Sequence, residues 1–393
     1  MKTKKLNTQA EDILSDEKMS DDIVNGFLDD EQKTSAEFLL AGDIRKAISS
    51  KKNIFDPEQK NILDQRIIQS INKSKKNKTI ALSGSAAAIL ILLGLSIIFK
   101  VIDQSEIKRY AMEGSFPSEQ EKTTLLLPGQ KEIKIESQES VIEYSANGNE
   151  IKIDEQSNIE QPEIEDNNKY NSVIVPYGKR SKITLPDNSI VWLNSGSRLI
   201  YPIKFNPEKR EVFLEGEAMF VVSHNENRPF FVLTPNLDIK VLGTSFNVSA
   251  YSDEEYVSTV LENGSVEIKY TGNILNFQRT EIMTPGNLAN YNIAEKSITQ
   301  SRVNPKNYTS WKDGYVILEQ SSLESIAKKL SRYYNVSIKF IDPEISKETF
   351  SGYLDLRNSA IQVLEIIAEI VDIEVTPVNN SISIRKKQDS PEI

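Results

Sequence analysis

The chain has 393 residues, of which 38% are hydrophobic and 26% are charged, and its formal net charge is −10. This acidic balance argues against broad nucleic-acid binding, because phosphate contacts need a basic surface. The absence of cysteine excludes disulfides, thiolate nucleophiles, cysteine-based zinc sites and lipoprotein anchoring.

Residues 1–78 form a nearly neutral N-terminal arm in which charge is unevenly placed, acidic from Glu11 to Glu31 and basic from Arg45 to Lys78. Apolar residues at helical spacing predict three or four short helices, one of which begins just after Asp56-Pro57. Such short helices bury little apolar surface. The arm therefore either completes its core against a partner or forms a small self-contained bundle.

Residues 79–100 predict a transmembrane helix. No charged residue occurs from Ile80 to Phe99, and a helix of this length spans the roughly 30 Å hydrocarbon layer. A buried core helix would show a polar face, whereas this segment offers only small hydroxyls, and a cleaved signal peptide would lie nearer the N-terminus. Positions assigned to the membrane include Ile80, Gly84, Ala88, Leu92 and Phe99.

The charges that flank this segment predict its orientation. Five basic residues precede it and three follow it, namely Arg66, Lys73, Lys75, Lys76 and Lys78, then Lys100, Lys108 and Arg109. The positive-inside rule then places the N-terminus in the cytoplasm and the C-terminus outside. Gly84 and Ala88 are a small-residue pair that could support helix pairing or local unwinding, although small residues are common in such helices.

Beyond the membrane segment, short alternating strands and closely spaced turn residues predict an all-β region. We divide it into a β-rich segment and linker over 101–170 and a β domain over 171–300. Sandwich, barrel and solenoid architectures all fit this pattern. Two similar units, Leu214 to Val221 and Leu261 to Ile268, repeat a strand–glycine–strand motif and favour solenoid-like stacking.

Motifs in residues 171–268 resemble those of the FecR family of transmembrane anti-sigma regulators. The matching residues, to which we assign a structural role, are Pro176, Gly178, Pro186, Asp187, Trp192, Leu193, Asn194, Gly216, Glu217, Phe220, Pro229, Phe230, Gly243, Thr244, Phe246, Val248 and Gly264. Asn188 stands where the family usually has a turn glycine, and Met219 stands where an aromatic residue is common. The resemblance implies a β-rich domain outside the membrane.

Residues 311–387 predict a small α+β domain made of two βαβ-like halves. A strand from Trp311 to Leu318 precedes a helix opened by the capping box Ser321-x-x-Glu324, and Ser359-x-x-Gln362 opens the second helix. A hairpin around Asn379-Asn380 ends the domain. This region resembles the small secretin and TonB short N-terminal domain found at the end of many FecR-like proteins of the Bacteroidetes type.

Catalytic patterns are weak throughout the sequence. The single histidine, His224, lies in a polar turn, and no nucleophile elbow, dinucleotide loop, Walker loop or EF-hand spacing occurs. Glu215 and Glu217 lie two residues apart, so a strand would place both side chains on one face. Such a pair could serve as the two carboxylates of a glycosidase, although a solvent-exposed strand face is commoner. We therefore expect no enzyme activity, cofactor or metal.

The resemblance implies a signalling mechanism. The periplasmic signalling domain of an outer-membrane TonB-dependent transducer would bind the outer part of this chain by adding a strand to an exposed edge. The signal would then cross the inner membrane, with envelope proteases possible participants, and release a cytoplasmic extracytoplasmic-function sigma factor from residues 1–78. The candidate sigma-binding residues are Asp21, Asp22, Ile23, Phe27, Leu28, Asp29 and Asp30.

Two alternatives belong to other functional classes. The first is a membrane-anchored module whose β domain binds glycan or peptidoglycan, and it predicts that residues 1–78 have no partner. The second is an envelope hydrolase that uses Glu215 and Glu217. It predicts that the outer domain turns over a sugar substrate.

Overall fold

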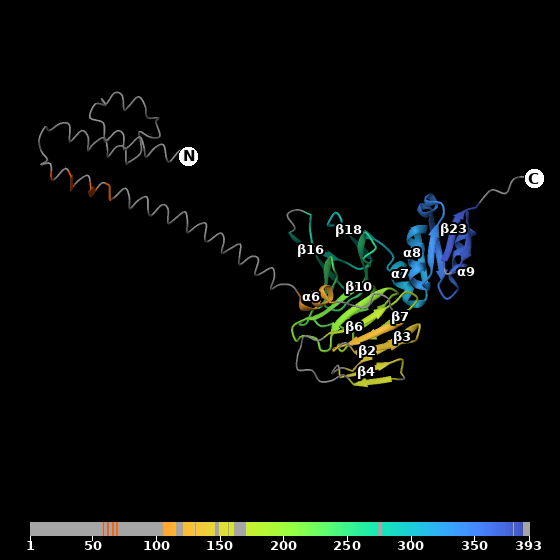
Figure 1. Ribbon diagram of the computed structural model, residues 1–393, viewed down its shortest axis with the longest axis horizontal. Coiled ribbons are helices and arrows are strands. Elements are labelled where there is room, and N and C mark those ends of the chain that lie inside the picture. The colour runs from red at the N-terminus through yellow and green to blue at the C-terminus, as the bar shows by residue number, and fades with distance from the viewer. Residues whose placement is uncertain are drawn as a thin grey trace, which may run out of the picture. The chain divides into compact units, whose positions relative to one another are not determined.

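Figure 1 shows the computed structural model of the chain, which divides into two compact units, 1–102 and 103–393. The structure describes residues 105–114, 121–129, 131–145, 149–155, 157–160, 170–273, 277–379 and 381–387, and seven positions between 58 and 69. Those seven positions are helical and exposed, as expected for the helix predicted after Asp56-Pro57. No helix among the described residues is long and apolar enough to span a membrane, and the predicted segment 79–100 lies outside them.

In the larger unit, the described residues from 121 to 302 consist mainly of β-strands, which confirms the all-β prediction for this region. Among the described residues, eighteen strands form one hydrogen-bonded network made of two sheets. Sheet A runs β2 (Lys131–Ile135), β1 (Thr123–Leu127), β6 (Tyr170–Val175), β9 (Ser197–Pro202), β10 (Arg210–Val221), β11 (Phe230–Leu233), β12 (Leu237–Val241), β15 (Val266–Thr271) and β16 (Gln278–Met283).

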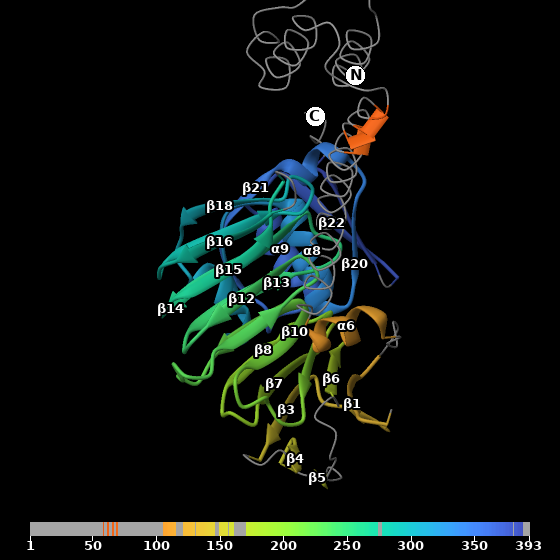
Figure 2. The same ribbon diagram turned by 90° about the vertical axis from the view of Figure 1, so that its left-hand side faces the viewer.

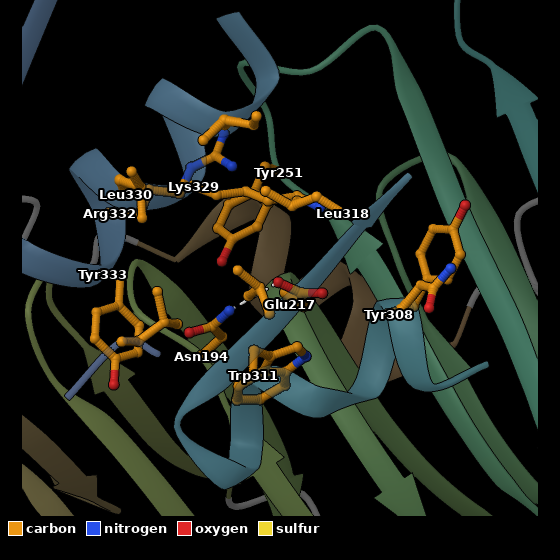
Figure 3. A pocket seen from close by; sticks show the side chains of 14 residues that line it. Asn194, Glu217, Tyr251, Tyr308, Trp311, Leu318, Lys329, Leu330, Arg332 and Tyr333 are labelled. Atoms are coloured by element: carbon orange, nitrogen blue, oxygen red, sulfur yellow. Dashed lines mark hydrogen bonds between the residues drawn. The ribbon is translucent and has the colours of Figure 1, made fainter. Parts of the chain in front are cut away.

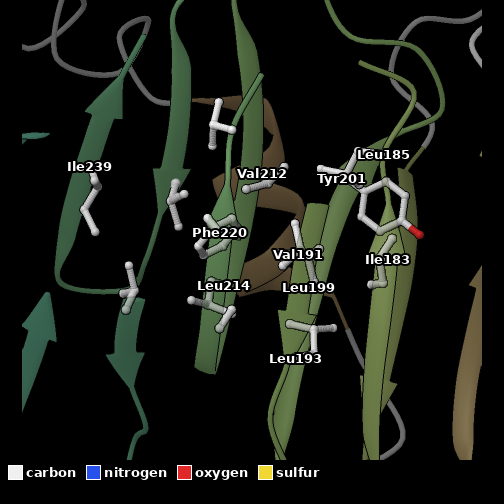
Figure 4. Close-up of a cluster of buried hydrophobic side chains, with 14 of the residues drawn as sticks. Ile183, Leu185, Val191, Leu193, Leu199, Tyr201, Val212, Leu214, Phe220 and Ile239 are labelled. Carbon is white, nitrogen blue, oxygen red and sulfur yellow. The ribbon is translucent and has the colours of Figure 1, made fainter. Parts of the chain in front are cut away.

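Sheet B shares β10 with sheet A. It runs β5 (Ser157–Glu160), β4 (Glu150–Ile153), β3 (Glu139–Tyr144), β7 (Arg180–Thr184), β8 (Ile190–Leu193), β10, β13 (Ser245–Ala250), β14 (Tyr256–Asn263), β17 (Asn287–Asn292) and β18 (Ser297–Arg302). One cluster of buried side chains draws on both sheets, so the sheets enclose a common core (Figure 4). Side chains that alternate between the two faces supply that core in strands such as β3, β8 and β12.

The repeated glycine motif marks the places where the chain passes between the sheets. Gly216 interrupts β10 where that strand changes its partner from β9 in sheet A to β13 in sheet B. Gly264 separates β14 in sheet B from β15 in sheet A. Both residues have a positive φ, +89° and +94°, and a Cβ on Gly216 would lie only 2.6 Å from the Cα of Ser197. Glycine is required at position 216 because only glycine combines a readily accessible positive φ with the absence of a Cβ.

The segment predicted as a β-rich region and linker, 101–170, contributes to the same core. Strand β1 pairs with β6, and β3 pairs in parallel with β7. Inside the core, the Tyr201 hydroxyl on β9 donates to the Tyr144 hydroxyl on β3 at 2.7 Å. Strands β1 to β5 therefore share one hydrophobic cluster with the strands after residue 170.

A short helix, α6 (Glu106–Glu113), packs beside β9 and β10 rather than in the core between the sheets (Figure 2). Its Ile107 and Ala111 are buried with Ile200 and Phe213 in a separate apolar cluster. At the rim of this contact, the Lys108 ammonium lies 2.8 Å from the Asp238 carboxylate. The helix is thus fixed to the outer side of sheet A.

The C-terminal domain has its own core. It comprises β19 (Tyr315–Ser322), α8 (Leu323–Tyr334), β20 (Ser337–Phe340), β21 (Thr349–Asp355), α9 (Ala360–Ala368), β22 (Ile373–Val378) and β23 (Ser381–Lys386). Strand–helix–strand order occurs twice, as predicted, but β19 does not pair with β20, nor β21 with β22. Instead β19 pairs with β21, and β23 lies between β20 and β22, with which it forms the predicted hairpin.

Two local predictions for this domain need correction. Residues 310–313 form a turn of 3-10 helix, so the strand starts at Tyr315 rather than at Trp311, whose side chain is buried. Helix α8 is capped by Ser322, one residue later than predicted, because its hydroxyl accepts the Ser325 amide. The capping box of Ser359 and Gln362 at α9 is confirmed.

Candidate functional site

The C-terminal domain meets the β domain at a junction formed by β8, β10 and β13 on one side and by Trp311 and helix α8 on the other (Figure 3). We call this contact the junction. The connector to it includes α7 (Lys306–Thr309) and the 3-10 turn Ser310–Asp313. Several residues at the junction belong to the predicted family motif.

A chain of hydrogen bonds leads from the β domain to Trp311. The Asn194 and Asn247 side-chain amides donate to the two carboxylate oxygens of Glu217, at 2.8 and 2.9 Å. The Trp311 indole N–H donates to the remaining amide oxygen of Asn247 at 3.2 Å. Because Asn247 and Trp311 are both buried, this network fixes the orientation of the connector on sheet B.

A charged anchor secures helix α8. The Arg332 guanidinium, only 5% exposed as a residue, contacts the Glu254 carboxylate at 2.6 Å and both Asp253 oxygens at 2.9 and 3.0 Å. It also lies 3.8 Å from the centre of the Tyr251 ring. Arginine suits this place because its planar group forms several directed hydrogen bonds and stacks on an aromatic face.

A third contact joins the turn after β6 to the end of α8. The Gly178 amide donates to the Arg332 carbonyl at 2.8 Å, and the Arg180 guanidinium lies 3.9 Å from the centre of the Tyr333 ring. Gly178 has φ +78° and closely faces Asn335. A motif glycine therefore allows two backbones to approach each other at the junction.

The junction encloses a cavity of about 50 Å³. Glu217, Tyr251 and Trp311 contribute to its lining, together with Lys329 of α8. Ligand pockets for small organic molecules typically measure about 300–1,000 Å³. This cavity has room for about one or two water molecules, so the junction as built is a contact between domains rather than a sugar-binding cleft.

Burial raises the pKa of the Glu217 carboxyl above its ordinary value of 4.5, while the Lys329 charge and the hydrogen bonds from Asn247 and Asn194 oppose that rise. The folded protein consequently holds this proton to a higher pH than the unfolded chain does. The contribution of Glu217 to stability must then fall as pH rises from 4.5 through the raised pKa.

We expect the unfolding free energy of the wild-type protein to fall relative to that of Glu217→Gln as pH is raised from about 4.5 to 7. Glutamine keeps the side-chain shape but does not titrate. Urea denaturation of both proteins across this range measures the difference. Parallel pH profiles would show that Glu217 does not titrate differently in the folded and unfolded states.

The other motif residues serve the fold. Leu193, Phe220, Phe230, Phe246 and Val248 belong to the core between the sheets. Pro176, Pro186, Pro229, Gly243 and Thr244 lie outside the strands in connecting segments, as do Gly178 and Gly264. Asp187 binds the buried Arg210, and the Trp192 ring lies within 6 Å of the ammonium groups of Lys182 and Lys312.

The proposed carboxylate pair does not form one site. Arg198 binds Glu215 at 2.6 Å, whereas Glu217 is held by Asn194 and Asn247. The two residues flank Gly216, where β10 passes between the sheets. His224 is exposed, and no cluster of three potential ligands for a metal occurs among the described residues. The candidate sigma-binding and transmembrane residues lie outside the described part of the chain.

Sequence reasoning did not identify Arg332, Asn247 or Trp311 as junction residues. Asn247 lies within a motif stretch, but its role depends on a tryptophan 64 residues later. Arg332 occupies an ordinary position near the end of an amphipathic helix. The acidic pair Asp253-Glu254, in the turn between β13 and β14, is the sequence feature that could have indicated a cationic partner.

Comparison with known families agrees with this two-part architecture. The sequence model of the FecR protein family matches residues 171–267, and that of the FecR C-terminal domain matches residues 315–384. The chain contains both domains of FecR-family proteins. The junction therefore joins the FecR domain to the FecR C-terminal domain.

Two crystal structures from Parabacteroides distasonis, at 1.65 and 2.50 Å resolution, are similar to this chain. Each is described as that of a proposed anti-sigma factor. Both share 29% sequence identity with it at a TM-score of 0.51. The alignments cover 55% and 56% of this chain, and 99% and 100% of the crystallised chains. A comparison with curated proteins gives no match.

Proposed function

We propose that this chain is a single-pass inner-membrane anti-sigma factor of the FecR family. Residues 1–78 would hold a sigma factor in the cytoplasm, residues 79–100 would cross the membrane, and the unit 103–393 would receive a signal outside. The main support is that both FecR domains occur together, joined through FecR motif residues, in a chain similar to proposed anti-sigma factors.

The partner that delivers the signal would be the periplasmic signalling domain of a TonB-dependent transducer. Strands β20 and β22 pair only with β23 among the described strands, so each leaves an open edge. Exposed apolar side chains occur on the same domain, with Ile370 70% and Ile341 60% exposed. Open edges with apolar neighbours suit the addition of a strand from a partner.

Helix α6 supports the idea that such binding reaches the membrane. Only six residues separate Phe99, the end of the uncharged segment, from Glu106, the start of α6. Because α6 is packed on β9 and β10, movement of the FecR domain would pull on the chain close to the predicted membrane helix. Envelope proteases could act on this segment once it is displaced.

A tagged full-length protein, isolated from its native cells with its bound partners, tests the proposal. We expect a sigma factor at near-stoichiometric amounts. Substitution of Asp29→Asn and Asp30→Asn should weaken its binding about three- to tenfold at low salt and reduce the salt dependence, because two surface charge contacts are lost.

The matched control replaces two acids elsewhere in the same arm, Glu58→Gln and Asp64→Asn, which should leave affinity nearly unchanged. Equal effects of the two pairs would reject the acidic segment as the contact. If no sigma factor binds the intact chain, the anti-sigma role is wrong, and the glycan-binding module becomes the favoured hypothesis.

A further inference from the structure

Strand β16 forms one end of sheet A and pairs only with β15 among the strands that the structure describes. Two of the most exposed apolar side chains among the described residues lie on or beside it, Ile282 at 67% and Phe277 at 64%. An open strand edge with exposed apolar residues readily pairs with another chain. The sequence of β16 and the direction of its backbone hydrogen bonds indicate what would occupy this edge.

The phase of the hydrogen bonds determines which residues face the open edge. The Gly272 amide donates to the Phe277 carbonyl at 2.9 Å, so Phe277 directs its backbone groups toward β15. In an antiparallel ladder this direction alternates, and Gln278, Thr280 and Ile282 therefore direct theirs outward. In agreement, the Ile282 carbonyl accepts a long side-chain hydrogen bond, 3.5 Å, from Gln300 of β18. A strand added at this edge would displace that bond.

The sequence of β16 is complementary to itself when two copies run antiparallel about Thr280. Arg279 then lies opposite Glu281 of the second copy, on both sides of the symmetry axis. Gln278 lies opposite Ile282, and exposed Phe277 lies opposite Met283, which is fully buried in the core. Thr280 meets its own equivalent as a hydrogen-bonded pair, because both direct their backbone groups outward.

We propose that the β domain pairs with a second copy of this chain through β16, in a two-fold antiparallel register centred on Thr280. Opposite charges directly across an antiparallel pair stabilise it, and like charges destabilise it. Any other register would lose the two Arg279–Glu281 contacts, so these charges select one partner and one alignment. The inference does not depend on the proposed anti-sigma role.

Disulfide trapping tests this interface in the full-length protein, which has no cysteine of its own. The Cα atoms of a hydrogen-bonded antiparallel pair lie about 5.5 Å apart, within disulfide reach. Thr280→Cys should therefore form a covalent dimer on mild oxidation. Thr299→Cys is the matched control, because Thr299 is an exposed threonine on β18, an edge strand of sheet B.

We expect at least about fivefold more dimer from Thr280→Cys than from Thr299→Cys. Adding Arg279→Glu to Thr280→Cys should lower the dimer yield about fivefold, since two attractive pairs become repulsive. Adding Glu281→Arg as well should restore it. Equal trapping at the two threonines, or a charge reversal that has no effect or is not rescued, would overturn the proposal.

Discussion

Replacing Asp187 with asparagine is expected to lower the free energy of unfolding by about 3–5 kcal/mol, because it leaves a buried arginine without its counter-charge. The Arg210 guanidinium is 2% exposed and lies 2.7 Å from the Asp187 carboxylate. It also donates to the backbone carbonyls of Ser223 and Arg228, at 2.8 and 2.9 Å. These contacts tie two connecting segments, 185–189 and 222–229, to the start of β10.

The adjacent ion pair provides a matched control. Lys209 and Glu211 flank Arg210 and are 2.9 Å apart, but the lysine side chain is 45% exposed. Glu211→Gln should change stability by less than about 1 kcal/mol, because solvent screens exposed pairs. Urea denaturation followed by circular dichroism measures both variants. Equal effects would mean that burial does not strengthen the Asp187–Arg210 pair.

Truncation of Trp311 to alanine is expected to cost about 3–5 kcal/mol of the free energy that holds the C-terminal domain on the FecR domain. The indole is buried at the junction, and its N–H is the donor to Asn247. Trp311→Phe keeps most of the ring and should cost about 1–2 kcal/mol, for the lost hydrogen bond. Limited proteolysis of the connector, residues 303–314, reports the loosened junction.

The control for this experiment is the only other tryptophan of the chain, Trp192. Its partly exposed ring lies near the ammonium groups of Lys182 and Lys312, contacts worth about 1 kcal/mol. Trp192→Ala should leave the connector resistant to protease. If cleavage of the connector is unchanged in Trp311→Ala, the indole does not hold the two domains together.

Local features of this fold were predictable because neighbouring residues determine them. Alternating apolar residues predicted the strands, and turn residues predicted where they end. Asn188 illustrates the point, since it adopts φ +63°, the left-handed conformation that a family glycine would adopt. Asparagine tolerates that conformation. The capping box at Ser359 was likewise readable because both partners lie within one helical turn.

The sequence by itself determined the strand-rich class, the turns, the apolar core and the resemblance to FecR, all of which depend on short-range pattern. Only the tertiary structure decided that Trp311 is an anchor rather than a strand residue, that strands before residue 170 complete the core, and that Glu215 and Glu217 have separate partners. Such outcomes depend on residues tens of positions apart, and no local pattern encodes which of them meet. The Asp187–Arg210 pair and the junction exist because folding brings those distant groups together in a place that water cannot reach.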